Sequence, residues 1–108
     1  MTLEYFKNQI HEELMGAKEY IEKAIEVKPK HRGWSMCFVK MADMEAGHAG
    51  NLMRMLEESI QKKDYSDNTT TDPSTGMTAT NDPEVLYKDL MEEFGETMTY
   101  VENMKRGL

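Results

Sequence analysis

The chain has 108 residues, 39% of them hydrophobic, and a formal charge of −7, which suits one domain with a modest core. The acidic balance argues against nucleic acid or an anionic membrane surface as a partner. The single cysteine, Cys37, excludes an internal disulfide and a cysteine-based zinc or iron–sulfur set within one chain. No secretion signal or membrane-spanning run is visible, so we expect a cytoplasmic protein.

Residues 2–27 form the first predicted helix, with Thr2 as its candidate N-cap. Its apolar residues recur every three or four positions, and they are Leu3, Phe6, Ile10, Leu14, Ala17, Ile21, Ala24 and Ile25. Glu13 lies about 60° from the centre of this stripe, whereas Glu12 lies nearly opposite it. Glu13 is therefore either an inward site residue or a charge at the stripe boundary. Tyr20 lies on the same edge, where its hydroxyl can reach a ligand carboxylate.

A second helix is predicted over residues 34–63, after Pro29 and Gly33 interrupt the helical pattern. So short a connection makes the first two helices an antiparallel hairpin. Glu45 lies in the middle of an apolar stripe made of Trp34, Phe38, Met41, Ala49, Leu52 and Leu56. A buried carboxylate needs a proton, a cation or a metal, and His48 follows it by one turn on the same face.

The hairpin of residues 1–63 brings three of these side chains to one level. Glu13 lies 17 residues before Lys30, in the turn, and Glu45 lies 15 residues after it. At about 1.5 Å per residue, their heights differ by only about 3 Å. A Glu-x-x-His spacing alone arises by chance in many helices, but face, spacing and height agree here. We therefore predict a metal site made of Glu13, Glu45 and His48, which are also the candidate catalytic residues.

Residues 64–82 are rich in Ser, Thr, Asp and Asn and show no periodicity, so we expect a flexible polar loop. Asp82 followed by Pro83 is typical of a helix start and predicts a third helix over residues 83–105. This helix repeats, at the same offsets, the Glu-Glu and Tyr positions of the first helix. Glu93 is thus either a further carboxylate ligand or part of a short coincidental match.

The other reactive residue types have plainer interpretations. Cys37 lies on the flank of the apolar stripe, and we expect a buried structural thiol rather than a reactive one. We expect His11 on the surface and His31 in a solvated turn. The chain has 11 methionines, and we expect those on the apolar stripes to fill the core, with a thioether copper site as the alternative. They are Met36, Met41, Met44, Met53, Met55, Met91 and Met98.

These residues resemble those of the ferritin-like superfamily, the group of ferritins, rubrerythrins and encapsulated ferritins. Glu13 followed by Tyr20 on one helix, and Glu45-x-x-His48 on the next, look like one half of that family's di-iron bundle. They look most like encapsulated ferritins, in which a two-helix subunit dimerises to complete a four-helix bundle. The resemblance covers residues 8–60.

The resemblance implies an all-α fold in which an antiparallel hairpin plus a third helix forms a ferritin-like four-helix bundle core by dimerisation. It implies Glu13, Glu45 and His48 as ligands and Tyr20 as a neighbour of the site. The chain departs from the usual single-chain bundle because it has only one Glu-x-x-His and no fourth helix. A two-fold homodimer, alone or within a higher oligomer, is the simplest completion. Residues 103–108 show no clear version of the cargo peptide of encapsulated ferritins.

Two functions follow from these observations. The first is a di-iron protein, with two Fe per dimer, that oxidises Fe²⁺ with O₂ or peroxide as a ferroxidase; Mn or Zn could occupy the same ligands. The second is a non-enzymatic helical dimerisation or interaction module with the same fold and no metal. In that case Glu45 and His48 would form a buried polar pair that specifies the dimer.

Overall fold

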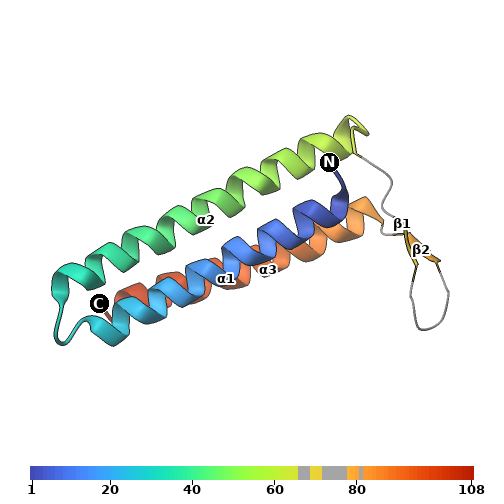
Figure 1. Ribbon diagram of the computed structural model, residues 1–108. Helices are drawn as coiled ribbons and strands as arrows, with labels where there is room; N and C mark the ends of the chain where they lie inside the picture. Colours follow the sequence, from blue (N-terminus) through green and yellow to red (C-terminus); the bar gives the residue numbers. More distant parts are fainter. Residues whose placement is uncertain (66–68, 72–77, 81) are drawn as a thin grey trace.

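The computed structural model describes residues 1–65, 69–71, 78–80 and 82–108. Its elements are α1 (Leu3–Val27), α2 (Arg32–Gln61), β1 (Thr69–Thr71), β2 (Thr78–Thr80) and α3 (Pro83–Arg106). The first two helices form an antiparallel hairpin, and α3 lies beside it, parallel to α1 (Figure 1). The predicted helical hairpin with a packed third helix is confirmed.

The helix ends have clear local causes. Thr2 caps α1, because its hydroxyl accepts a hydrogen bond from the backbone N–H of Tyr5 at 3.0 Å. The Asp82 side chain caps α3 in the same way, and Pro83 occupies the first helical position. The α2 helix has no side-chain cap and begins two residues earlier than predicted. The buried hydroxyl of Ser35 instead fixes the turn by donating to the carbonyl of Ala24 at 2.7 Å.

The core lies along α1, the most enclosed of the helices. Seven of its eight predicted inward residues are buried, and only Ile25 is half-buried. One cluster joins the start of α1 to the second half of α2 and to Leu90 of α3. A second cluster joins the end of α1 to the first half of α2 and to Val101. The site described below lies on α1 and α2 between these two clusters.

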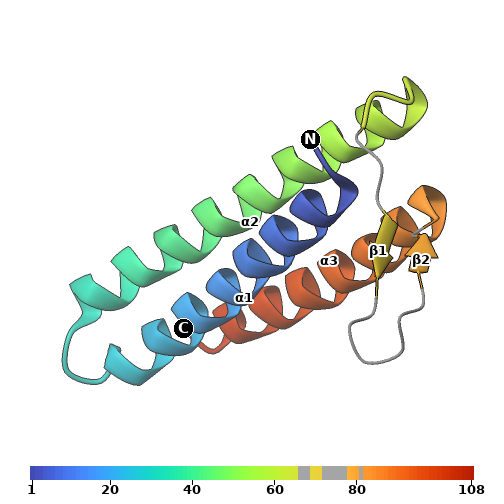
Figure 2. The same ribbon diagram turned by 45° about the vertical axis from the view of Figure 1, so that its right-hand side comes forward.

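The segment between α2 and α3 contains a short antiparallel strand pair that the sequence did not predict. Thr69 pairs with Thr80, Thr70 with Ala79 and Thr71 with Thr78 (Figure 2). Threonine is β-branched and favours extended backbone, which explains strands at these positions. The predicted flexibility of residues 66–68, 72–77 and 81 lies outside the described residues.

One edge of α2 is uncovered. The buried residues of this helix centre about 60° to one side of Glu45, because α3 packs on that side through pairs such as Asp43 with Lys105. The other side, here called the open edge, consists of exposed residues only: Trp34, Cys37, Met41, Met44, His48 and Met55. Trp34 is 58% exposed and Met44 is 60% exposed. The apolar stripe of α2 is thus wider than α1 and α3 together can cover.

Two predictions about burial are wrong, the first for this reason and the second only in part, because Met36 and Met91 lie off the open edge. Cys37 is exposed on the open edge and is not a buried structural thiol. Of the seven methionines expected in the core, five are exposed: Met36, Met41, Met44, Met55 and Met91. Only Met53 is fully inside the core. Among the described residues, none of the helices is long and apolar enough to cross a membrane.

Candidate metal centre

The structure brings Glu13, Glu45 and His48 together. Each offers one ligand atom, and these atoms all lie within 4.8 Å of one another. The His48 Nδ1 atom is 3.4 Å from Oε2 of Glu13, across the interface between α1 and α2. The level expected from counting along the hairpin is therefore the level at which the side chains meet.

Glu13 has a buried carboxylate oxygen that lacks a hydrogen bond in the part of the chain that the structure describes. Its Oε2 atom is buried and has no hydrogen-bond partner among the described residues. Only 22% of the Glu13 side chain is exposed, whereas 54% of the His48 side chain is exposed. A buried carboxylate oxygen without a partner is unfavourable, and a bound cation removes that penalty. The donor set therefore fits a metal ion.

Electrostatics at Glu45 point the same way. The hydrogen bond that a protonated Glu45 can donate to the Glu13 carboxyl, burial, and the negative charge of Glu13 together raise the pKa of Glu45 above its ordinary value. The nearby His48 imidazole lowers this pKa, but its effect is the smallest of the four. Two carboxylates that share one site favour a proton or a cation between them. A divalent ion would therefore bind here in competition with a proton.

Tyr20 makes a different contact from the one expected. Its ring stacks on Phe38, with 6.2 Å between the ring centroids and 26° between the planes. Within the described part of the chain, its hydroxyl has no hydrogen bond to Glu13 or Glu45. Tyr20 is therefore a half-buried aromatic residue that packs on Phe38 of α2.

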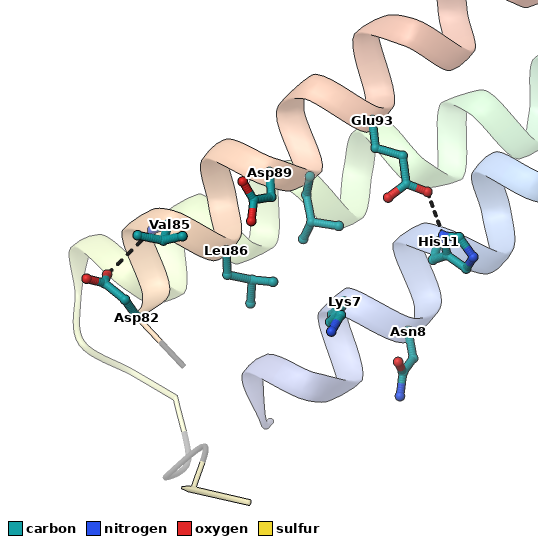
Figure 3. A pocket seen from close by; sticks show the side chains of 9 residues that line it. Lys7, Asn8, His11, Asp82, Val85, Leu86, Asp89 and Glu93 are labelled. Atoms are coloured by element: carbon teal, nitrogen blue, oxygen red, sulfur yellow. Dashed lines mark hydrogen bonds and ion pairs between the residues drawn. The ribbon is translucent and has the colours of Figure 1, made fainter. Parts of the chain in front are cut away.

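Glu93 is not brought to this cluster. Its carboxylate pairs with His11, at 2.5 Å between Oε1 and Nδ1, on the side of α1 that faces α3. This pair lies at one end of a cavity of about 340 Å³ between α1 and α3 (Figure 3). His11 is exposed, as expected, and its partner was not anticipated because the sequence does not reveal how α3 docks.

No family model, curated protein or solved structure matches this chain. The functional assignment therefore depends on the chemistry of the three side chains. Two carboxylates and one imidazole suit Fe, Mn or Zn better than Cu. Three side chains are fewer than the roughly four to six donors that these ions take, so water, a second carboxylate oxygen or a second subunit would supply the rest.

Proposed function

We propose that this chain is a ferritin-like metal-binding protein in which two subunits share a di-iron site and oxidise Fe²⁺ with O₂ or peroxide. The observation that carries the proposal is the buried Oε2 of Glu13, which has no hydrogen bond among the described residues and lies beside Glu45 and His48. Two copies of these three residues supply four carboxylates and two imidazoles. That set equals the donor inventory of a carboxylate-bridged di-metal bundle.

The spacing of residues on α2 supports a second copy as the partner. Residues alternate at intervals of four and three along the helix: Trp34, Phe38, Met41, Glu45, His48, Leu52, Met55 and Ser59. This alternation is the heptad pattern of a helix–helix seam. The open edge exposes much of this seam, and a self-complementary interface would bury it.

The seam also has a centre. Its midpoint falls between Glu45 and His48, so antiparallel pairing of two α2 helices about that point is self-consistent. In this register Glu45 lies beside the partner's His48, and Met41 lies beside the partner's Leu52. The apolar ends of the seam would exclude water, while the polar residues at its centre would face one another. Both half-sites would then meet on the two-fold axis.

The residues of the chain have distinct roles in this proposal. Glu13 and Glu45 provide hard oxygen donors and negative charge, and His48 provides one nitrogen donor at the more exposed side. Because the pKa of Glu45 is raised, a metal ion and a proton would compete for its carboxylate. Glu13, Glu45 and His48 of two subunits would hold two Fe²⁺ ions, which would supply the two electrons that, with two protons, reduce O₂ to hydrogen peroxide.

A second function is favoured by the open edge itself, which exposes apolar surface whether or not metal binds. The chain would then be a helical dimerisation module, and Glu45 and His48 would specify its register. Anaerobic calorimetry with Fe²⁺ separates the two. Saturable binding at one ion per subunit that is lost in Glu45→Ala, but kept in Glu12→Ala, supports the metal protein. An intact dimer that binds no ion supports the module.

A further inference from the structure

Gly16 lies one turn after Glu13 on α1, and its backbone closely approaches the Glu45 side chain. A Cβ atom added at Gly16 would lie 2.9 Å from Oε2 of Glu45, 3.4 Å from its Cδ and 3.5 Å from its Cγ. The first distance is shorter than real Cβ atoms tolerate. The Glu45 carboxylate therefore occupies the space that any other residue at position 16 would fill.

A glycine in a helix interior is unfavourable relative to alanine, because it loses more backbone freedom on folding. Gly16 is the one glycine within α1. The neighbouring helix offers a contrast, because a Cβ at Gly47 would meet nothing within 4 Å. The structural reason for glycine is thus present at position 16 and absent at position 47.

We infer that Gly16 is a positioning residue for the candidate metal centre, whose missing side chain lets the Glu45 carboxylate lie against α1 within reach of Glu13. This inference rests on the proposed metal-binding function. Donors on one ion, with bonds of about 2.0–2.2 Å, lie at most about 4.4 Å apart. The three donor atoms lie within 4.8 Å of one another, so a shift of a few tenths of an ångström brings them inside that limit. A methyl group at position 16 pushes Glu45 off α1, and the spacing no longer suits one ion.

The test compares Gly16→Ala with Gly47→Ala. The second substitution makes the same chemical change on α2, where the new methyl group meets no atom within 4 Å. Zn²⁺ and anaerobic Fe²⁺ affinities are measured by calorimetry, and helix content and molar mass check that each variant folds. We expect Gly47→Ala to bind as the wild type does and Gly16→Ala to bind at least tenfold more weakly. Equal affinities in all three chains would overturn the positioning role alone. A wild-type chain that binds neither ion would overturn the proposed function and, with it, this role.

A second measurement needs no metal. With chelator present, Gly47→Ala should raise the midpoint of thermal unfolding by more than Gly16→Ala does, because the contact with Glu45 offsets part of the gain in helix propensity at position 16. In a Glu45→Ala background the contact is gone, and Gly16→Ala should then raise the midpoint as Gly47→Ala does. The same response of Gly16→Ala in both backgrounds would overturn the contact between Gly16 and Glu45.

Discussion

The Nδ1 atom of His48 lies 3.4 Å from Oε2 of Glu13, and these two residues come from the two helices of an antiparallel hairpin, α2 and α1. The Glu13 atom has no hydrogen bond among the described residues, although it is buried. The two atoms are close enough for an ion pair, but the contact does not give this oxygen of Glu13 a hydrogen bond. A divalent cation would satisfy both residues.

The first prediction concerns Glu13. Glu13→Gln keeps the size of the side chain but removes the negative charge and one oxygen donor, so we expect metal affinity to fall at least tenfold. Glu12→Gln is the matched control, because Glu12 is its exposed neighbour in sequence. Competition with a chromogenic chelator measures both affinities. Equal losses in the two variants would indicate a general effect of charge and would contradict a ligand role for Glu13.

The second prediction concerns the stability of the metal-free chain. The pKa of Glu45 is raised in the folded state, from an ordinary value of 4.5, chiefly by the hydrogen bond with Glu13. The folded chain therefore holds this proton more tightly, and the resulting stability is present below the ordinary pKa and is lost as the pH rises through the raised pKa.

Glu45→Gln, which stays neutral, should consequently be more stable than the wild type at pH 7 and should lose this advantage at pH values below about 4.5. Thermal unfolding in the presence of chelator, followed over a pH series, measures the difference. A constant difference at every pH would show that Glu45 does not titrate differently in the folded and unfolded states. The residue that binds the metal would, on our account, destabilise the apoprotein.

The third prediction concerns the open edge. Met41→Lys places a charge in the proposed seam and should weaken dimerisation by more than about tenfold, which corresponds to about 1.4 kcal/mol. Met36→Lys is the control, because Met36 is 65% exposed and lies about 140° away from Met41 around α2. Sedimentation over a range of concentrations measures both. A monomer in all three chains, or equal weakening by both substitutions, would exclude this edge as the interface.

The fourth prediction concerns Glu93. Because it pairs with His11 between α1 and α3, Glu93→Gln should leave metal affinity unchanged. The pair is substantially exposed, so its loss should change the free energy of unfolding by no more than about 1 kcal/mol. Denaturant unfolding and metal titration on one preparation measure both quantities. Loss of a bound ion in Glu93→Gln would contradict this prediction and would show that Glu93 is a metal ligand.

The sequence predicted the convergence of Glu13, Glu45 and His48 because it depends on few quantities. The rise per residue and the short turn around Pro29 fix which residues of α1 and α2 face each other. Helix periodicity fixes which of two adjacent glutamates points inward. These are local properties, and they do not depend on how α3 packs.

The errors concern contacts that local patterns do not determine. Trp34 and Met41 belong to an apolar stripe that predicts burial, but the structure leaves them exposed because α3 covers the other side of α2. Cys37 is exposed for the same reason. The role of Gly16 depends on where the Glu45 carboxylate lies on the neighbouring helix, which no periodicity in α1 encodes.

The central claim is most directly tested by measuring metal stoichiometry and molar mass on one sample, by aerobic Fe²⁺ titration followed by light scattering. We predict a dimer that saturates at one iron per subunit, with a rise in ultraviolet ferric absorbance that Glu45→Ala abolishes. A folded chain that takes up no iron, zinc or manganese would contradict the claim. A dimer with that result would leave the helical interaction module as the function of this fold.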